Sequence, residues 1–159
     1  MMFHSPSYGE IDLTTVLVHI NTYLRSAPNE SHKIIIGSDS SPAVAGRAEF
    51  VTALVVHRVG RGGIYFWQKH TSDKMTILRD RMYREALYSL ELAHILVKEK
   101  VFGFGDTSTN WLEIHVDIGE NGPTRPMIKE IVGMVTGSGF TVKTKPASYA
   151  ASKVADRYT

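Results

Sequence analysis

Three strand-like segments follow one another near the start of the chain, and this succession constrains the fold more than any other feature. The first, 33–40 (KIIIGSDS), is a short β-branched run, and the second, 49–59 (EFVTALVVHRV), is longer. A glycine-rich turn at 60–63 leads into the third, 64–70 (IYFWQKH), since glycine adopts positive φ without steric cost. β-Branched and aromatic residues favour strands. The pattern therefore predicts an antiparallel meander.

Helical and strand-like segments alternate after the meander. Apolar residues at helical spacing predict a long helix from Thr76 to about Lys100, and strict alternation predicts a strand over 112–118. The remaining expected elements are a helix from Thr124, a short strand at 140–145, a final helix over 148–158, and an additional N-terminal helix that begins after Asp12. This order predicts an α/β fold with a mixed five-stranded sheet flanked by helices.

Length and composition restrict the class of protein. The chain has 159 residues, which fits one domain spanning 1–159, and 43% of them are hydrophobic, as expected of a globular protein. It contains no cysteine, which excludes disulfides and thiolate chemistry. No secretory signal or membrane-spanning run is found, so we expect a cytoplasmic protein with no membrane partner.

Four carboxylates occupy positions where catalytic or metal-binding side chains could be expected. Asp39 and Asp117 occupy the ends of the first and fourth strands, and would be neighbours if those strands pair in parallel. Glu85 lies at the margin of the apolar stripe of the long helix, and Asp156 lies in the last helix. Each also has an ordinary explanation: a turn residue at a strand end, an ion pair with a nearby arginine, or a solvated position.

Together the four carboxylates predict a metal site. Carboxylates brought close together cannot all stay ionised unless a cation neutralises them. Oxygen ligands of this kind suit Mg²⁺ or Mn²⁺. Zinc is a poorer match, because the chain has no cysteine and no pair of histidines at the helical i, i+4 spacing.

Several long segments resemble the RNase H-like YkuK family of predicted nucleases. They are IIIGSDSS, LRDRMYREALYSLELA, EIHVDIGENGPTRPMIKEIVGMV and the terminal KPASYAASKVADRYT. The resemblance extends from about Phe3 to Thr159. Ribonuclease H-like enzymes place acids on the first strand, the helix after the meander, the fourth strand and the last helix. By position, these roles would fall on Asp39, Glu85, Asp117 and Asp156.

The resemblance implies two-metal hydrolysis of a phosphodiester. Two cations roughly 4 Å apart would bridge the scissile phosphate, with Asp39 as the shared ligand. The substrate would be RNA, an RNA–DNA hybrid or branched DNA. Lys145 and Arg81 are candidates for contact with the substrate backbone. His115 lies two residues before Asp117 and is a candidate proton shuttle, with a buried or surface structural histidine as the alternative.

One departure narrows the implied activity. Exonucleases with a related acid quartet carry Tyr or His four or five residues before the last Asp, where this chain has Ser152 and Ala151. The pattern therefore favours an endonuclease of ribonuclease H or resolvase type. The rival interpretation is a non-catalytic nucleic-acid-binding or adaptor protein on the same fold. A lysine or arginine that filled the acidic pocket would favour this rival.

Overall fold

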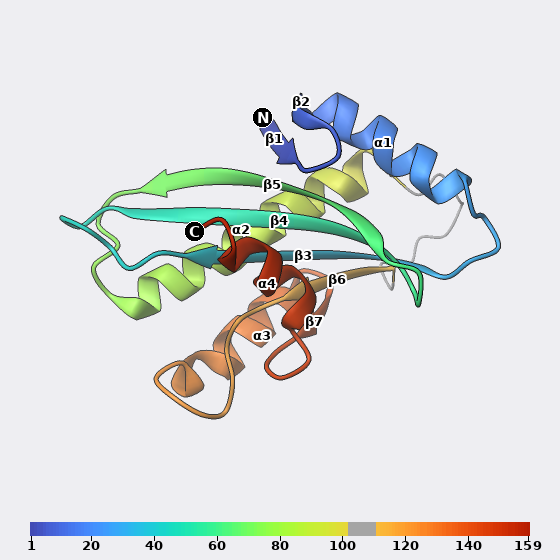
Figure 1. Cartoon of the computed structure of the whole chain (residues 1–159). Helices are drawn as coiled ribbons and strands as arrows, with labels where there is room; N and C mark the ends of the chain where they lie inside the picture. Colours follow the sequence, from blue (N-terminus) through green and yellow to red (C-terminus); the bar gives the residue numbers. More distant parts are fainter. Residues whose placement is uncertain (102–110) are drawn as a thin grey trace.

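A single twisted sheet organises the chain (Figure 1). The structure is a computed structural model that describes residues 1–101 and 111–159, excluding the side chains of 149–152. The sheet has seven strands in the order β2-β1-β5-β4-β3-β6-β7. The strands are β1 (Met2–Ser5), β2 (Gly9–Asp12), β3 (His32–Ser40), β4 (Ala48–Arg58), β5 (Gly63–Ser72), β6 (Leu112–His115) and β7 (Thr141–Lys143).

The predicted meander is confirmed, but the sheet is larger than expected. β3, β4 and β5 pair antiparallel, and β6 and β7 continue the sheet in parallel with β3. The five-stranded prediction was wrong because β1 and β2 form an antiparallel hairpin that joins β5 through His4 and Trp67. These strands have four residues each and little hydrophobic alternation, so their pairing depends on tertiary contact.

The helices lie on both faces of the sheet (Figure 1). They are α1 (Leu13–Arg25), α2 (Leu78–Lys98), α3 (Ile128–Gly137), which follows a 3₁₀ turn at Arg125–Met127, and α4 (Tyr149–Asp156). The hairpin β1–β2 precedes α1, and the carboxylate of Asp12 caps this helix by accepting from Thr15 N at 2.8 Å. Among the described helices, none is long and apolar enough to cross a lipid bilayer.

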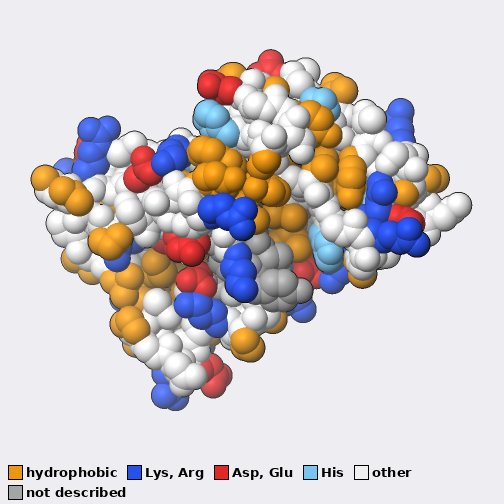
Figure 2. Space-filling model, in the orientation of Figure 1, with side chains coloured by type: hydrophobic (Ala, Val, Ile, Leu, Met, Phe, Trp, Pro, Cys, Tyr) orange, Lys and Arg blue, Asp and Glu red, His pale blue; other side chains and the backbone are white. Residues whose placement is uncertain are grey.

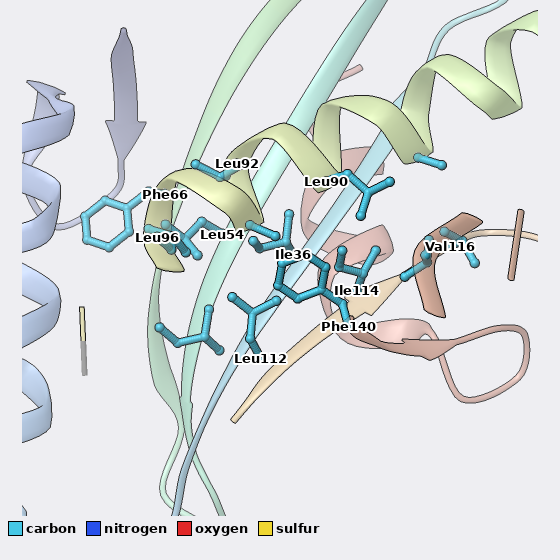
Figure 3. Packing of buried hydrophobic residues seen from close by; sticks show 14 of the residues in the cluster. Ile36, Leu54, Phe66, Leu90, Leu92, Leu96, Leu112, Ile114, Val116 and Phe140 are labelled. Carbon is cyan, nitrogen blue, oxygen red and sulfur yellow. The ribbon is translucent and has the colours of Figure 1, made fainter. Parts of the chain in front are cut away.

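The main core lies between the sheet and α1, α2 and α3. Leu92 and Leu96 of α2 pack over Ile36 and Leu54 of the sheet (Figure 3). Burial of such side chains contributes roughly 1.5–3 kcal/mol each. α4 covers part of the opposite face, where Ala155 packs on Val51 and Ala53 of β4. The sheet is therefore buried on one face and only partly covered on the other.

Several predicted boundaries differ from the structure, and two of them concern the start of α2 and the end of β6. α2 begins at Leu78 after Ile77, and no side chain caps it, so the expected cap at Thr76 was wrong. β6 ends at His115, three residues earlier than predicted, and Asp117 lies beyond the strand. An alternating sequence reveals which residues share a face, but not where the hydrogen-bonded ladder with a neighbouring strand stops.

The β4–β5 turn provides a test of the sheet. A Cβ at Gly63 would clash with the carbonyl oxygen of Val56, whereas a Cβ at Gly133 in α3 would meet no atom within 4 Å. We expect Gly63→Ala to lower the free energy of unfolding by more than about 1 kcal/mol. Gly133→Ala should raise it by about 0.5–1 kcal/mol, because alanine favours a helix interior. Urea unfolding measures both changes in the free energy of unfolding. The same change in both variants would contradict the observed register of β4 and β5.

Candidate active site

The parallel pairing of β3 with β6 brings Asp39 and Asp117 to the same edge and face of the sheet. Gly37 is in register with His115, and each aspartate lies two residues further along its own segment. Thr159 Oγ1 donates a hydrogen bond to Asp39 Oδ2 at 3.0 Å. Burial raises the pKa of Asp39, and the negative charges of Asp156 and Asp117 add to this rise despite the Thr159 hydrogen bond. The charges of two other predicted acids, Asp117 and Asp156, therefore act on Asp39.

Glu85 reaches the same region from α2. Its side chain is buried, with a residue exposure of 5%. Ser40 Oγ, at the end of β3, donates a hydrogen bond to Glu85 Oε1 at 2.6 Å. The pKa of Glu85 is raised to about 8, mainly by burial; the charges of Asp39 and Asp117 contribute to this rise, and the hydrogen bond from Ser40 opposes it. Without a cation, Glu85 is therefore mainly a neutral acid at pH 7.

A buried row of hydroxyl groups fixes α2 to the sheet beside Glu85. Ser38 Oγ lies 2.9 Å from Thr52 Oγ1 of β4 and 2.9 Å from Ser89 Oγ of α2. Ser89 follows Glu85 by one helical turn, so both face β3. These hydrogen bonds set the position of α2 along β3, and hence of the Glu85 carboxyl group.

Basic side chains border the acids. Lys145 Nζ lies 3.1 Å from Asp117 Oδ2, and the Lys145 side chain remains about half exposed. Gly119 leaves room for this lysine, because a Cβ there would lie 3.0 Å from Lys145 Cβ. Arg81 Nη1 donates to the carbonyl oxygen of Ser41 at 2.9 Å, which anchors the chain just after β3. Figure 2 shows acidic and basic side chains side by side on this face.

His115 is buried beneath the site, with a residue exposure of 3%. Its Nε2 lies 3.2 Å from Glu113 Oε2. Burial lowers its pKa, although Glu113 and the Ser148 backbone oppose this change, so the ring is mainly neutral near pH 7. This environment is that of a buried structural histidine, which is the alternative given above for His115. The role of His115 as a proton shuttle stays a prediction.

The structure brings the predicted acids near one another without assembling them into a metal cage. Across residues 1–101 and 111–159, no three His, Asp or Glu side chains are grouped closely enough to hold a metal ion. A bound cation would therefore require rotation of side chains away from their present partners. The side chains of Ala151 and Ser152, which bear on the distinction between exonuclease and endonuclease, lie outside the described residues.

Sequence reasoning missed two hydroxyl groups that contact the acids. Ser40 lies in the strand-ending IIIGSDSS, and alternation places it on the same face as Ser38, but its contact with Glu85 depends on how α2 packs. Thr159 contacts Asp39 across 120 residues of sequence, and no sequence pattern signals this contact. Both hydroxyls donate hydrogen bonds to carboxylate oxygens of the predicted acids.

The fold and the acidic side chains together define a ribonuclease H-like protein. The family described as "Ribonuclease H-like" matches residues 15–159, and the chain belongs to this family. Among curated proteins it is similar to the "Uncharacterized protein YkuK" of Bacillus subtilis (strain 168). The two are 32% identical over 167 residues, which cover 99% of this chain and 96% of the relative. No solved structure matches the chain.

The raised pKa of Glu85 predicts how stability depends on pH. Between its ordinary value of 4.5 and about 8, the folded state keeps a proton that the unfolded state has lost. The contribution of Glu85 to folding stability therefore declines as the pH rises from 4.5 to about 8. Glu85→Gln should change stability little near pH 4.5 and stabilise the fold by a few kcal/mol, in order of magnitude, near pH 8.

Thermal unfolding in EDTA at both pH values measures this effect. Glu99→Gln is the matched control, because Glu99 is exposed at the other end of the same helix. It should show no comparable gain between the two pH values. A gain for Glu85→Gln that does not depend on pH would contradict the buried neutral acid.

Proposed function

We propose that this protein hydrolyses phosphodiester bonds of nucleic acid with the help of divalent cations. The observation that carries the proposal is that carboxylates from β3, α2, α4 and the segment after β6 lie close enough for their charges to act on Asp39 and Glu85. The charges of Asp117 and Asp156 act on Asp39, and those of Asp39 and Asp117 act on Glu85. Membership of the ribonuclease H-like family supports a nuclease-like activity in general terms.

The donor groups suit Mg²⁺ or Mn²⁺. Asp39, Glu85, Asp117 and Asp156 offer only carboxylate oxygens, which hard cations prefer. The pKa of Glu85 is raised mainly by burial and in part by the charges of Asp39 and Asp117, and a carboxyl group perturbed in this way is common at functional sites. These residues would hold two ions, and the ions when bound would lower the pKa of an attacking water and stabilise the leaving oxygen.

The chain's own groups prepare this site. Glu85 must release its proton to act as a ligand, so ligation becomes easier as the pH rises toward about 8. To bind a cation, Asp39 would give up its hydrogen bond from the Thr159 hydroxyl. Asp117 would likewise give up its ion pair with the ammonium group of Lys145. Lys145 is half exposed on a flexible stem and can turn toward a substrate phosphate once it leaves Asp117.

A non-catalytic nucleic-acid-binding protein is the second candidate. The ion pair of Lys145 with Asp117, at 3.1 Å, favours it, because a carboxylate neutralised by lysine has less need of a cation. A binding protein of this kind would hold nucleic acid equally well in EDTA and would not cleave it with Mn²⁺.

Removing single carboxylates separates the two candidates. We expect Asp39→Asn or Asp117→Asn to reduce cleavage of labelled RNA, RNA–DNA hybrid or branched DNA by at least about a hundredfold, because each loses a charged metal ligand. Both should fold normally, since less repulsion remains at the strand ends. Glu99→Gln is again the control and should cleave like the wild type. Undiminished cleavage in both Asn variants would refute the two-metal scheme.

Substituting Lys145 tests the competition between lysine and metal. Lys145→Gln removes an ammonium group from Asp117, so Mn²⁺ should bind several-fold more tightly. Nucleic acid should bind more weakly, by roughly tenfold, if the lysine contacts a phosphate. Calorimetric titration with Mn²⁺ measures the first effect, and fluorescence anisotropy measures the second. Weaker Mn²⁺ binding in this variant would contradict the assignment.

A further inference from the structure

A hollow opens on the part of the sheet that α4 leaves uncovered. It has a volume of about 440 Å³, within the range of small-ligand pockets. Alternate residues of β4 explain its position: Val51 and Ala53 lie under α4, whereas Val55 and His57 on the same face line the hollow. Figure 2 shows hydrophobic and histidine side chains exposed on this face beside α4.

The hollow combines an aliphatic lining with a basic rim. Ile35, Val55, Val59 and Ala147 supply the apolar wall, and Val59 is 48% exposed. Lys33, Lys143, His57, His115 and Glu113 supply the polar groups.

The rim has unneutralised positive charge. Lys33 Nζ donates a hydrogen bond to Glu113 Oε1 at 2.8 Å. Burial alone would raise the pKa of Glu113, but Lys33 and His115 hold it below its ordinary value. The one carboxylate is thus already paired. Lys143 forms no ion pair with any carboxylate in the described part of the chain, so its charge is available to an anion.

The hollow is aligned with the acidic site. Glu113 and His115 line it, and Asp117 follows them at the same alternate spacing. At about 3.3 Å per residue, Glu113 is about 13 Å from Asp117 along an extended chain. A nucleic-acid strand with one phosphate at the acids could therefore place a nearby nucleotide in the hollow.

We infer that this hollow binds one unpaired nucleotide, with its base against the aliphatic wall and its phosphate at Lys143. The inference rests on the proposed function, because the path of the nucleic-acid strand from the hollow to the acids assumes that a phosphate binds at the acids. It narrows the substrate class to single-stranded or locally opened nucleic acid. In a duplex, stacked neighbours cover the faces of each base, so only an unstacked base can press its face against Val55 and Val59.

Binding of labelled oligonucleotides in EDTA, where no cleavage occurs, tests the inference by fluorescence anisotropy. Val55→Trp fills the hollow, and Lys143→Gln removes the rim charge. Each should weaken binding of a short single-stranded oligonucleotide by about fivefold or more, as loss of one stacked base or phosphate contact does. Binding of the same sequence as a duplex should change by less than about twofold. Lys129→Gln, at an exposed lysine of α3, is the matched control.

The outcomes separate this inference from the nuclease proposal. Because Lys143 lies on the rim, Lys143→Gln remains informative if Val55→Trp fails to fold. Single-strand binding that is unchanged in Lys143→Gln, or weakened no more than in Lys129→Gln, would overturn the inference. If the hollow variants lose single-strand binding while no substrate is ever cleaved, the nuclease proposal fails and the nucleotide site stands. Competition by a nucleoside monophosphate as strong as by the oligonucleotide would assign the hollow to a free nucleotide.

Discussion

The parallel pairing of β3 with β6 is the contact on which the acidic site depends. Gly37 and His115 are in register, and from that point both chains run to the same edge of the sheet. Asp39 and Asp117 therefore arrive together although 78 positions separate them in sequence (117 − 39). A shift of one residue in this register would move Asp117 to the other face, because side chains alternate along a strand.

The protein gathers negative charge and compensates for it only in part. Glu85 remains mainly protonated, Asp39 accepts a hydroxyl from Thr159, and Asp117 accepts the ammonium group of Lys145. Under the proposed function, a cation or a substrate phosphate would replace each of these contacts. The hydroxyl row through Ser38 lies in the core and, within the described part of the chain, makes no hydrogen bond to the carboxylates, so it would hold α2 in place during the proposed exchanges.

Much of the architecture could be predicted from the sequence, because strands and helices here carry strong hydrophobic patterns. The meander and the long helix follow from such patterns and from chain order, whereas the pairing of β3 with β6 was only a condition of the predicted site, which the structure meets. β1 and β2 could not be predicted, because four-residue strands gain their stability from tertiary pairing with β5. The boundary of β6 was misjudged since alternation continues beyond its ladder.

The candidate acids could be proposed from position and resemblance, but their environment could not. Burial of Glu85, its bond to Ser40 and the contact of Thr159 with Asp39 depend on three-dimensional packing. The pairing of Lys145 with Asp117 likewise depends on how the chain turns after β7, which brings Lys145 against Gly119 of the segment after β6.

A crystal structure grown with Mn²⁺ tests the central claim most directly, because the anomalous signal of manganese locates the ion. The account predicts Mn²⁺ bound by Asp39 and Asp117, with Glu85 turned toward it and Lys145 displaced from Asp117. Saturating Mn²⁺ with no ion at these carboxylates, and with Lys145 still paired to Asp117, would contradict it.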